Sequence, residues 1–255
     1  MKTQNPFQKL VDTLQILRGP RGCPWDREQT HASMKPYLLE ETYEVLEAID
    51  EGDEDRLMEE LGDLLLQIVF HSRIAEEKGS FSMNGVIQTI QAKLIRRHPH
   101  VFGDVKIHSS QEQLKHWERL KQEEGKTSAL DGVPKSAPAL LKAYRVQQKA
   151  AAVGFDWEKT EQVWEKVQEE ITEFGEALDQ GSREKMEDEF GDLMFALVNL
   201  SRFLQINPEE AARRAVDKFI RRFKKLEKVF QDQGKDLHQS SLEEMDAVWN
   251  RIKHQ

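Results

Sequence analysis

The stretch EETYE at residues 40–44 is followed by ELGD at residues 60–63, and the same order returns as EEITE at residues 169–173 and EFGD at residues 189–192. Corresponding acidic positions lie 129 residues apart. An internal repeat at a constant offset predicts two related halves. Apolar residues recur at helical spacing almost everywhere around these motifs, so we expect an all-α fold built from two tandem helical bundles.

Each copy of the repeat places acidic side chains where a helical protein assembles an oxygen-lined cation site. Residues three apart on a helix are separated by about 4.5 Å along its axis, so both can reach one ion. The short connection to the next helix predicts an antiparallel neighbour carrying the second pair. Carboxylate oxygens suit Mg²⁺, with Mn²⁺ as a substitute, better than Zn²⁺. The sequence predicts metal ligands at Glu170, Glu173, Glu189 and Asp192, and a second set at Glu41, Glu44, Glu60 and Asp63.

The alternative is that these acids lie on solvated helix faces, as most charged runs do. Two features argue for the metal site. The faces that carry Glu60 and Glu189 become apolar beyond the acids, and carboxylates beside a core are costly unless they are paired or metal-bound. Gly62 and Gly191 each interrupt a helix at a cost of about 1 kcal/mol relative to Ala. We therefore expect another helix or a ligand to approach closely at both glycines.

Basic residues follow the acidic motifs in both halves. Lys218, Arg221 and Arg222 share one helix, where Arg offers phosphate a two-pronged contact and Lys adds a mobile charge. Alone they would be ordinary surface residues, but beside an acidic metal cluster they favour polyphosphate binding. In the first half the basic residues lead into His98-Pro99-His100, which we interpret as a helix-ending turn rather than a metal site. Four tryptophans, Trp25, Trp117, Trp157 and Trp249, are candidates for stacking on a nucleobase, although each one singly favours helix packing.

Composition excludes several classes of protein. A net charge of −9 over 255 residues argues against a general nucleic-acid binder. Cys23 is the single cysteine, so no internal disulfide is expected. The beginning of the chain lacks a signal-peptide pattern, and the longest apolar stretch, near residues 64–70, is too short to cross a bilayer. We expect a cytoplasmic protein that does not bind membranes.

Periodicity and capping residues predict ten helices. They fall near residues 5–18, 34–50, 54–78, 83–97, 110–124, 137–152, 158–179, 183–206, 208–231 and 241–254. Ser82 and Ser182 are expected helix caps, and Pro208 suits a first helical position. We expect domains at residues 1–125 and 139–255, joined by a Gly- and Pro-containing linker at residues 126–138. Residues 19–25 are expected to form a loop with turns at Pro20 and Pro24 that shelters Trp25.

Together with the acidic repeat, three further motifs resemble the MazG family. They are GCPWD at residues 22–26, RRHPHVF at residues 96–102 and VGFDW at residues 153–157, and the resemblance covers essentially the whole chain. It implies the fold of the all-α NTP pyrophosphatase superfamily. It also implies Mg²⁺-dependent hydrolysis of (d)NTPs to (d)NMP and pyrophosphate, a homodimer, and a role in clearing nucleotides.

The resemblance also implies roles for individual residues. The family's metal ligands fall on the acidic set of the C-terminal half. Its nucleotide contacts fall on Lys166, Glu169, Glu170, Lys185, Asp188, Lys218, Arg221, Arg222 and Trp249. We expect Glu173 or Glu169 to accept a proton from water and Lys185 to help neutralise the polyphosphate. At the 129-residue offset Tyr37 replaces Lys166, so the N-terminal set is expected to bind metal with weak or no turnover.

Three alternatives remain open from the sequence. One is a sibling pyrophosphatase specific for dUTP or a damaged nucleotide. Another is a non-catalytic nucleotide or alarmone sensor that uses both halves for binding. The last is a helical scaffold with incidental acidic faces, which the repeated carboxylate spacing disfavours.

Overall fold

The computed structural model describes residues 5–106, 109, 113 and 128–253, and within these ranges every regular element is helical. The chain divides into two compact units, Met1–Ile107 and His108–Gln255. The described helices include none that is both long enough and apolar enough to cross a membrane. The all-α prediction is therefore confirmed.

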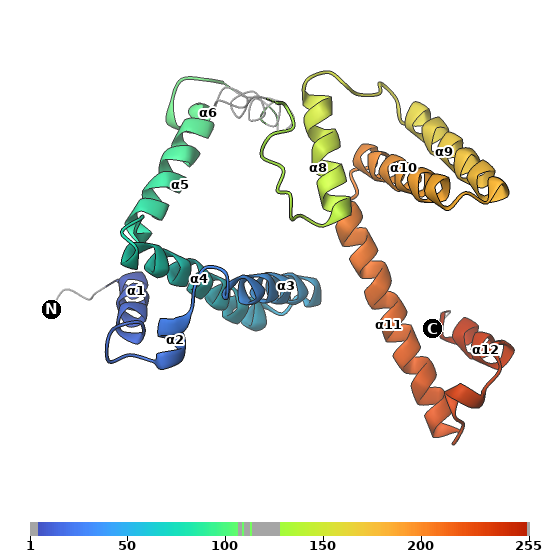
Figure 1. Cartoon of the computed structure of the whole chain (residues 1–255), viewed down its shortest axis with the longest axis horizontal. Coiled ribbons are helices and arrows are strands. Elements are labelled where there is room, and N and C mark those ends of the chain that lie inside the picture. Colours follow the sequence, from blue (N-terminus) through green and yellow to red (C-terminus); the bar gives the residue numbers. More distant parts are fainter. Residues whose placement is uncertain (1–4, 107–108, 110–112, 114–127, 254–255) are drawn as a thin grey trace. The chain divides into compact units, whose positions relative to one another are not determined.

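The N-terminal unit is organised around a pair of antiparallel helices that carry the first acidic set (Figure 1). Its helices are α1 (Pro6–Leu17), α2 (Pro24–Glu28), α3 (Lys35–Glu51), α4 (Glu54–Glu77), α5 (Met83–Arg97) and α6 (Pro99–Phe102). Helix α4 packs along α3, and α1 packs against α4. Between α1 and α4 lies an apolar cluster of Leu14, Met34, Val69, Phe70 and Ile74, which holds the acidic helix in place.

The C-terminal unit repeats this plan with a longer final pair of helices (Figure 1). Its elements are α8 (Ala139–Ala152), α9 (Thr160–Gln180), α10 (Arg183–Phe203), α11 (Pro208–Asp232), the 3₁₀ turn η1 (Leu237–Gln239) and α12 (Leu242–Lys253). Helices α9 and α10 pack along each other, and α8 packs against α10 as α1 does against α4. Helix α12 packs against α11 around the buried side chains of Leu226, Phe230, Val248 and Ile252.

Two tight connections align the acidic pairs within each unit. Helix α3 ends at Gly52, with φ of 68°, and α9 ends at Gly181, with φ of 67°. This left-handed conformation is strained for residues with a Cβ, so glycine suits both positions. The next residue then caps the following helix: Asp53 accepts from the N–H of Arg56, and Ser182 from that of Lys185. The chain reverses within two residues, which places the second acidic pair beside the first.

The described helices agree with the sequence predictions to within about three residues at their ends. The expected caps at Ser82 and Ser182 are confirmed, as is the start of α11 at Pro208. The predicted helix at residues 110–124 and Trp117 lie outside the described residues, and the expected domain and linker boundaries stay a prediction.

The loop expected at residues 19–25 needs correction. Pro24 begins the short helix α2 instead of a turn, because proline is well suited to a first helical position. Trp25 is not sheltered: it is 48% exposed, and its ring meets that of Tyr37 in a T-shaped contact with centroids 5.8 Å apart. A second short helix, α6, follows His98 where only a turn was expected.

Candidate functional site

Three of the four predicted ligands in the C-terminal unit converge. Carboxylate oxygens of Glu170, Glu173 and Glu189 all lie within 4.8 Å of one another, a spacing that one cation can bridge. Glu170 is 5% exposed, whereas Glu173 and Glu189 are half-buried. Burial, followed by repulsion from Glu170, raises the pKa of Glu173. Crowded carboxylates that resist ionisation are a setting that a divalent cation relieves, and hard oxygen donors of this kind fit Mg²⁺ or Mn²⁺.

Lys166 neutralises part of this cluster. Its Nζ atom lies 2.7 Å from Glu169 Oε1 and 2.8 Å from Glu170 Oε1. The hydrogen bonds to Glu169 and then Glu170 raise the pKa of Lys166, so the ammonium form is strongly favoured. Lys166 thus contacts both Glu170, a predicted metal ligand, and Glu169, a predicted substrate-binding residue, on the same helix, α9.

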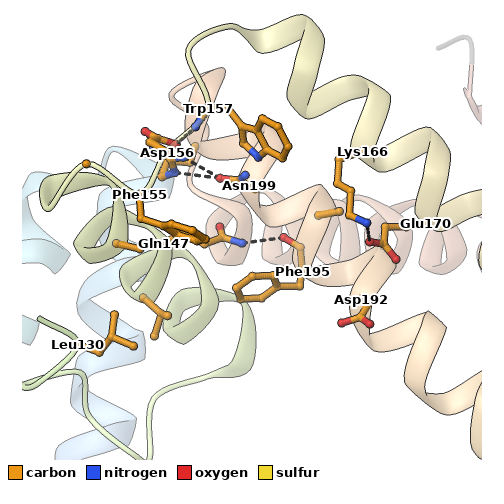
Figure 2. A pocket seen from close by; sticks show the side chains of 15 residues that line it. Leu130, Gln147, Phe155, Asp156, Trp157, Lys166, Glu170, Asp192, Phe195 and Asn199 are labelled. Carbon is orange, nitrogen blue, oxygen red and sulfur yellow. Dashed lines mark hydrogen bonds and ion pairs between the residues drawn. The ribbon is translucent and has the colours of Figure 1, made fainter. Parts of the chain in front are cut away.

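A cavity of about 790 Å³ opens beside the cluster, within the range of nucleotide-sized ligand sites. Lys166, Glu170 and Asp192 line one side of it (Figure 2). Asp192 lies outside the three-carboxylate group but reaches the same cavity. The cavity therefore joins the predicted metal ligands to a space able to hold a larger part of a substrate.

The side of the cavity away from the carboxylates is formed by residues that sequence reasoning largely missed. Phe155 and Trp157 provide aromatic rings, and Gln147 and Asn199 provide amides (Figure 2). Arg202 also lines the cavity. The VGFDW motif and Trp157, a predicted candidate for base stacking, signalled this region, whereas its polar residues were not predicted. A glutamine on the buried face of α8 has no distinguishing pattern in the sequence, so the amides could not have been selected from it.

An arginine organises the polar part of this wall. Arg202 pairs with Asp156 through both terminal nitrogens, one of them at 2.9 Å. It also donates to Asn199 Oδ1 from Nε at 3.1 Å and from Nη2 at 2.8 Å. Because Asp156 precedes α9 and Arg202 ends α10, these contacts fix the entry of α9 against α10.

Other predicted residues lie elsewhere in the unit. Lys185 is exposed at the start of α10 and donates to Gln180 Oε1 at 2.7 Å, and Asp188 is exposed on the same helix. Glu169 is exposed and contacts Lys166. Within the described part of the unit, neither Lys185, Asp188 nor Glu169 lines the cavity, and their predicted roles stay predictions.

The predicted basic arm occupies the second half of the long helix α11. Lys218, Arg221 and Arg222 do not line the cavity formed by described residues of this chain. Trp249 packs instead on Phe219, with ring centroids 5.1 Å apart, at the edge of the α11–α12 cluster. Within the described residues, the basic arm thus takes no part in the cavity that Lys166, Glu170 and Asp192 line.

The N-terminal unit holds a corresponding group. Glu41, Glu60 and Asp63 place carboxylate oxygens within 4.8 Å of one another. Burial, then repulsion from Asp63, raises the pKa of Glu41, and Glu44 also contributes to this shift. In each unit three of the four predicted acids therefore converge. The acid outside the group is Glu44 in the N-terminal unit and Asp192 in the C-terminal unit.

The close approach expected at the helical glycines is not made by another helix of this chain, as far as its residues are described. Beyond its own helix backbone, a Cβ added at Gly62 or Gly191 would meet no heavy atom of the described structure within 4 Å. Both residues are exposed, so their backbone faces open space. The other expected occupant, a ligand, stays a prediction.

Comparison with known proteins adds to this geometry. A family model for the MazG nucleotide pyrophosphohydrolase domain matches residues 29–102 and 158–227, so each match contains one acidic set. The chain is 50% identical over 250 residues to the nucleoside triphosphate pyrophosphohydrolase/pyrophosphatase MazG of Thermotoga maritima, covering 97% of this chain and 95% of that protein. It is 46% identical over 258 residues to the nucleoside triphosphate pyrophosphohydrolase of Escherichia coli K12, with 98% of both chains covered. An uncharacterized protein of Bacillus subtilis, YabN, is 49% identical over 251 residues, which are 97% of this chain and 51% of that protein.

Proposed function

Because the chain belongs to the MazG nucleotide pyrophosphohydrolase family, we propose that it hydrolyses nucleoside triphosphates, deoxy forms included, to the monophosphate and pyrophosphate. The observation that carries this proposal is the meeting of Glu170, Glu173 and Glu189 in one group, of which Glu170 also lines a nucleotide-sized cavity. A polyanionic substrate would be repelled by such a cluster unless cations intervened. The site therefore requires a divalent ion together with its substrate.

Glu170, Glu173, Glu189 and Asp192 are the residues that would hold Mg²⁺, or Mn²⁺ in its place. When bound, such an ion neutralises phosphate charge and lowers the pKa of a coordinated water. Lys166 lies at the cavity wall and can exchange its contact with Glu170 for a phosphate oxygen once that carboxylate is engaged elsewhere. It then adds positive charge where the triphosphate carries the most negative charge.

Proton transfer is assigned to a carboxylate of α9. Burial and neighbouring acids raise the pKa of Glu173, which makes it a better proton acceptor than an ordinary glutamate. Glu169 is the other candidate, because it is exposed beside Lys166 and is not part of the three-carboxylate group. Lys185 would steady the leaving phosphates from the start of α10.

A second copy of the chain is part of the proposal. Phe219, Ile220 and Phe223 on α11 are 55%, 44% and 39% exposed, respectively, and exposed apolar patches are common at protein–protein interfaces. A homodimer that covers them can bring Lys218, Arg221, Arg222 and Trp249 to the carboxylates of the other copy. The cytoplasm, where nucleoside triphosphates are abundant, is the expected compartment, and removal of unwanted nucleotides the expected role.

The decisive experiment incubates the protein with each NTP and dNTP in the presence of Mg²⁺ and measures pyrophosphate. Glu173→Gln keeps the size of the side chain but removes its charge, so we expect pyrophosphate release to fall at least 100-fold with an unchanged circular dichroism spectrum. Retained turnover in that variant would refute the assignment. The same assay on dUTP and on oxidised nucleotides separates a general enzyme from a specialised sibling.

The contribution of each unit is tested separately. Replacing the four acids of the C-terminal set by Ala should abolish turnover, while replacing Glu41, Glu44, Glu60 and Asp63 by Ala should leave most of it. Activity that survives the first replacement and not the second would assign catalysis to the N-terminal unit instead.

A further inference from the structure

The cavity in the C-terminal unit extends well beyond the groups used for metal and phosphate. Figure 2 shows Lys166, Glu170 and Asp192 on one side and Gln147, Phe155 and Leu130 on the other. The proposed chemistry of pyrophosphate release uses only the first side. The second side combines aromatic rings with amides, a combination that recognises a flat, hydrogen-bonding ligand.

Gln147 is the most unusual residue of this second side. It is 7% exposed, and its Nε2 atom donates to the backbone oxygen of Phe195 at 2.8 Å. Exchanging the two amide atoms would set Oε1 against that carbonyl, so the orientation is fixed. Its Oε1 atom is buried and has no hydrogen-bond partner among the described residues. A buried acceptor left unpaired costs free energy and calls for an explanation.

Asn199 is oriented in the opposite sense. Its Oδ1 accepts two hydrogen bonds from Arg202, at 2.8 and 3.1 Å, which leaves the amide nitrogen to face away from the guanidinium. Both residues line the cavity together with Trp157 (Figure 2). This side of the cavity thus has a hydrogen-bond acceptor, Gln147 Oε1, and a donor, Asn199 Nδ2, in fixed orientations, together with the exposed indole ring of Trp157.

The corresponding helix of the N-terminal unit buries an apolar side chain and no amide. There α1 packs against α4 as α8 packs against α10, and the buried residue of α1 is Leu14, in an apolar cluster. Helix α8 instead buries the amide of Gln147. A hydrogen-bond donor that enters from outside the chain would explain its unpaired acceptor.

We propose that this side of the cavity holds the nucleobase of the substrate and that Gln147 Oε1 accepts a hydrogen bond from a base N–H. The inference rests on the proposed function for the identity of the ligand as a nucleotide. In adenine nucleotides that donor is the exocyclic amine, the one N–H of the base that remains once N9 is joined to the sugar, and the base lies against Trp157.

The test compares two ligands that differ in this group. The dissociation constants of AMP and of purine riboside 5′-monophosphate, which lacks the 6-amino group, are measured by calorimetry on the full chain with Mg²⁺. We expect AMP to bind about tenfold more tightly, the usual effect of withdrawing a donor from a buried acceptor. In Gln147→Leu the two constants should agree within twofold.

A matched control comes from the neighbouring residue. Gln148 accepts from Arg145 at 2.8 Å on the same helix and does not line the cavity, so Gln148→Leu should keep the tenfold ratio. Equal constants in the unaltered protein would overturn the proposal, and this comparison stands even if Gln147→Leu fails to fold. A ratio that persists in folded Gln147→Leu, or an absence of AMP binding, would also overturn it.

Parallel measurement of pyrophosphate release from ATP keeps the two proposals distinct. A tenfold ratio without pyrophosphate release would leave the base site standing and refute the enzyme activity. Pyrophosphate release with equal dissociation constants would support the enzyme activity and refute the base site.

Discussion

Replacing Lys166 by Met should destabilise the metal-free protein and make its stability depend more strongly on Mg²⁺. Lys166 is the cation that contacts Glu170, whose side chain is 7% exposed, at 2.8 Å. Without Lys166, the carboxylates of Glu170, Glu173 and Glu189 would repel one another. Water would screen this repulsion only in part, because Glu170 is buried and the other two are half-buried. Methionine retains the length and apolar stem of lysine, so the change removes the charge and little packing.

The magnitude follows from burial. Breaking a fully buried ion pair costs about 3–5 kcal/mol, whereas exposed pairs are worth about 0–1 kcal/mol. The Lys166 side chain is 37% exposed, so solvent screens the interaction and the estimate must be reduced. We expect the free energy of unfolding to fall by about 1–2 kcal/mol in EDTA, a loss of roughly 2–8 °C in Tm for a domain of this size.

Thermal melts followed by circular dichroism, in EDTA and in millimolar Mg²⁺, measure this effect. A bound ion stabilises the folded state by mass action and substitutes for the lost ammonium, so the deficit should shrink when Mg²⁺ is added. Lys228→Met is the matched control, because Lys228 lies 3.8 Å from Asp232 in an exposed pair one helical turn apart. It should change Tm by less than 1 °C in either buffer. Equal Tm values for Lys166→Met and the unaltered protein in EDTA would refute the reasoning.

Three further predictions concern the fold. Gly191→Ala should raise the free energy of unfolding by about 1 kcal/mol in chemical denaturation, because the new Cβ meets only open space; a loss would show that another molecule packs there. Hydrogen bonds from Arg18 lower the pKa of Glu77, so this carboxylate stabilises the protein above its ordinary pKa near 4.5 and the contribution is lost as pH falls further. Glu77→Gln should therefore flatten the decline in stability between about pH 5 and pH 3, and an unchanged profile would contradict this. Leu14→Ala, at a residue that is 1% exposed, should cost about 2–5 kcal/mol by denaturant titration; a cost below 1 kcal/mol would show that α1 is not held by this cluster.

The helices were predictable because their ends carry local chemistry. Ser82, Ser182 and Asn207 each cap a helix with a side-chain oxygen, which is a property of a few consecutive residues. The convergence of the acidic pairs was predictable for the same reason, since a two-residue turn leaves the next helix few alternatives. Local patterns therefore determined both the framework and the carboxylate cluster.

What could not be predicted depends on residues distant in the chain. Gln147 faces Phe195 across 48 residues, and Arg202 reaches Asp156 across 46, so no spacing within one helix signals either contact. The exposure of Trp25 was misjudged because burial of a ring depends on what packs over it. In the structure its ring is 48% exposed and makes a T-shaped contact with Tyr37.

The two units also differ in how their basic residues are engaged. Arg56, at the position that corresponds to Lys185, is tied to Glu47 at 3.1 Å, to Glu51 at 2.5 Å and to Glu60 at 3.4 Å. Three carboxylates hold this guanidinium, and the hydrogen bond to Glu51 is the first cause of its raised pKa. A phosphate that approached it would have to displace those glutamates, whereas Lys185 contacts only the neutral amide of Gln180 among the described side chains.

This difference adds to the expectation that the N-terminal set, with Tyr37 in place of Lys166, has weak or no turnover. A cation is present at Arg56, but its guanidinium is paired with acidic neighbours, one of which, Glu60, belongs to the three-carboxylate group of this unit. In the C-terminal unit the cation that touches the corresponding group, Lys166, also lines the cavity. We therefore expect the two similar carboxylate groups to differ in activity, because among the described residues only the C-terminal unit has a cation placed to transfer its contact from the protein to a phosphate.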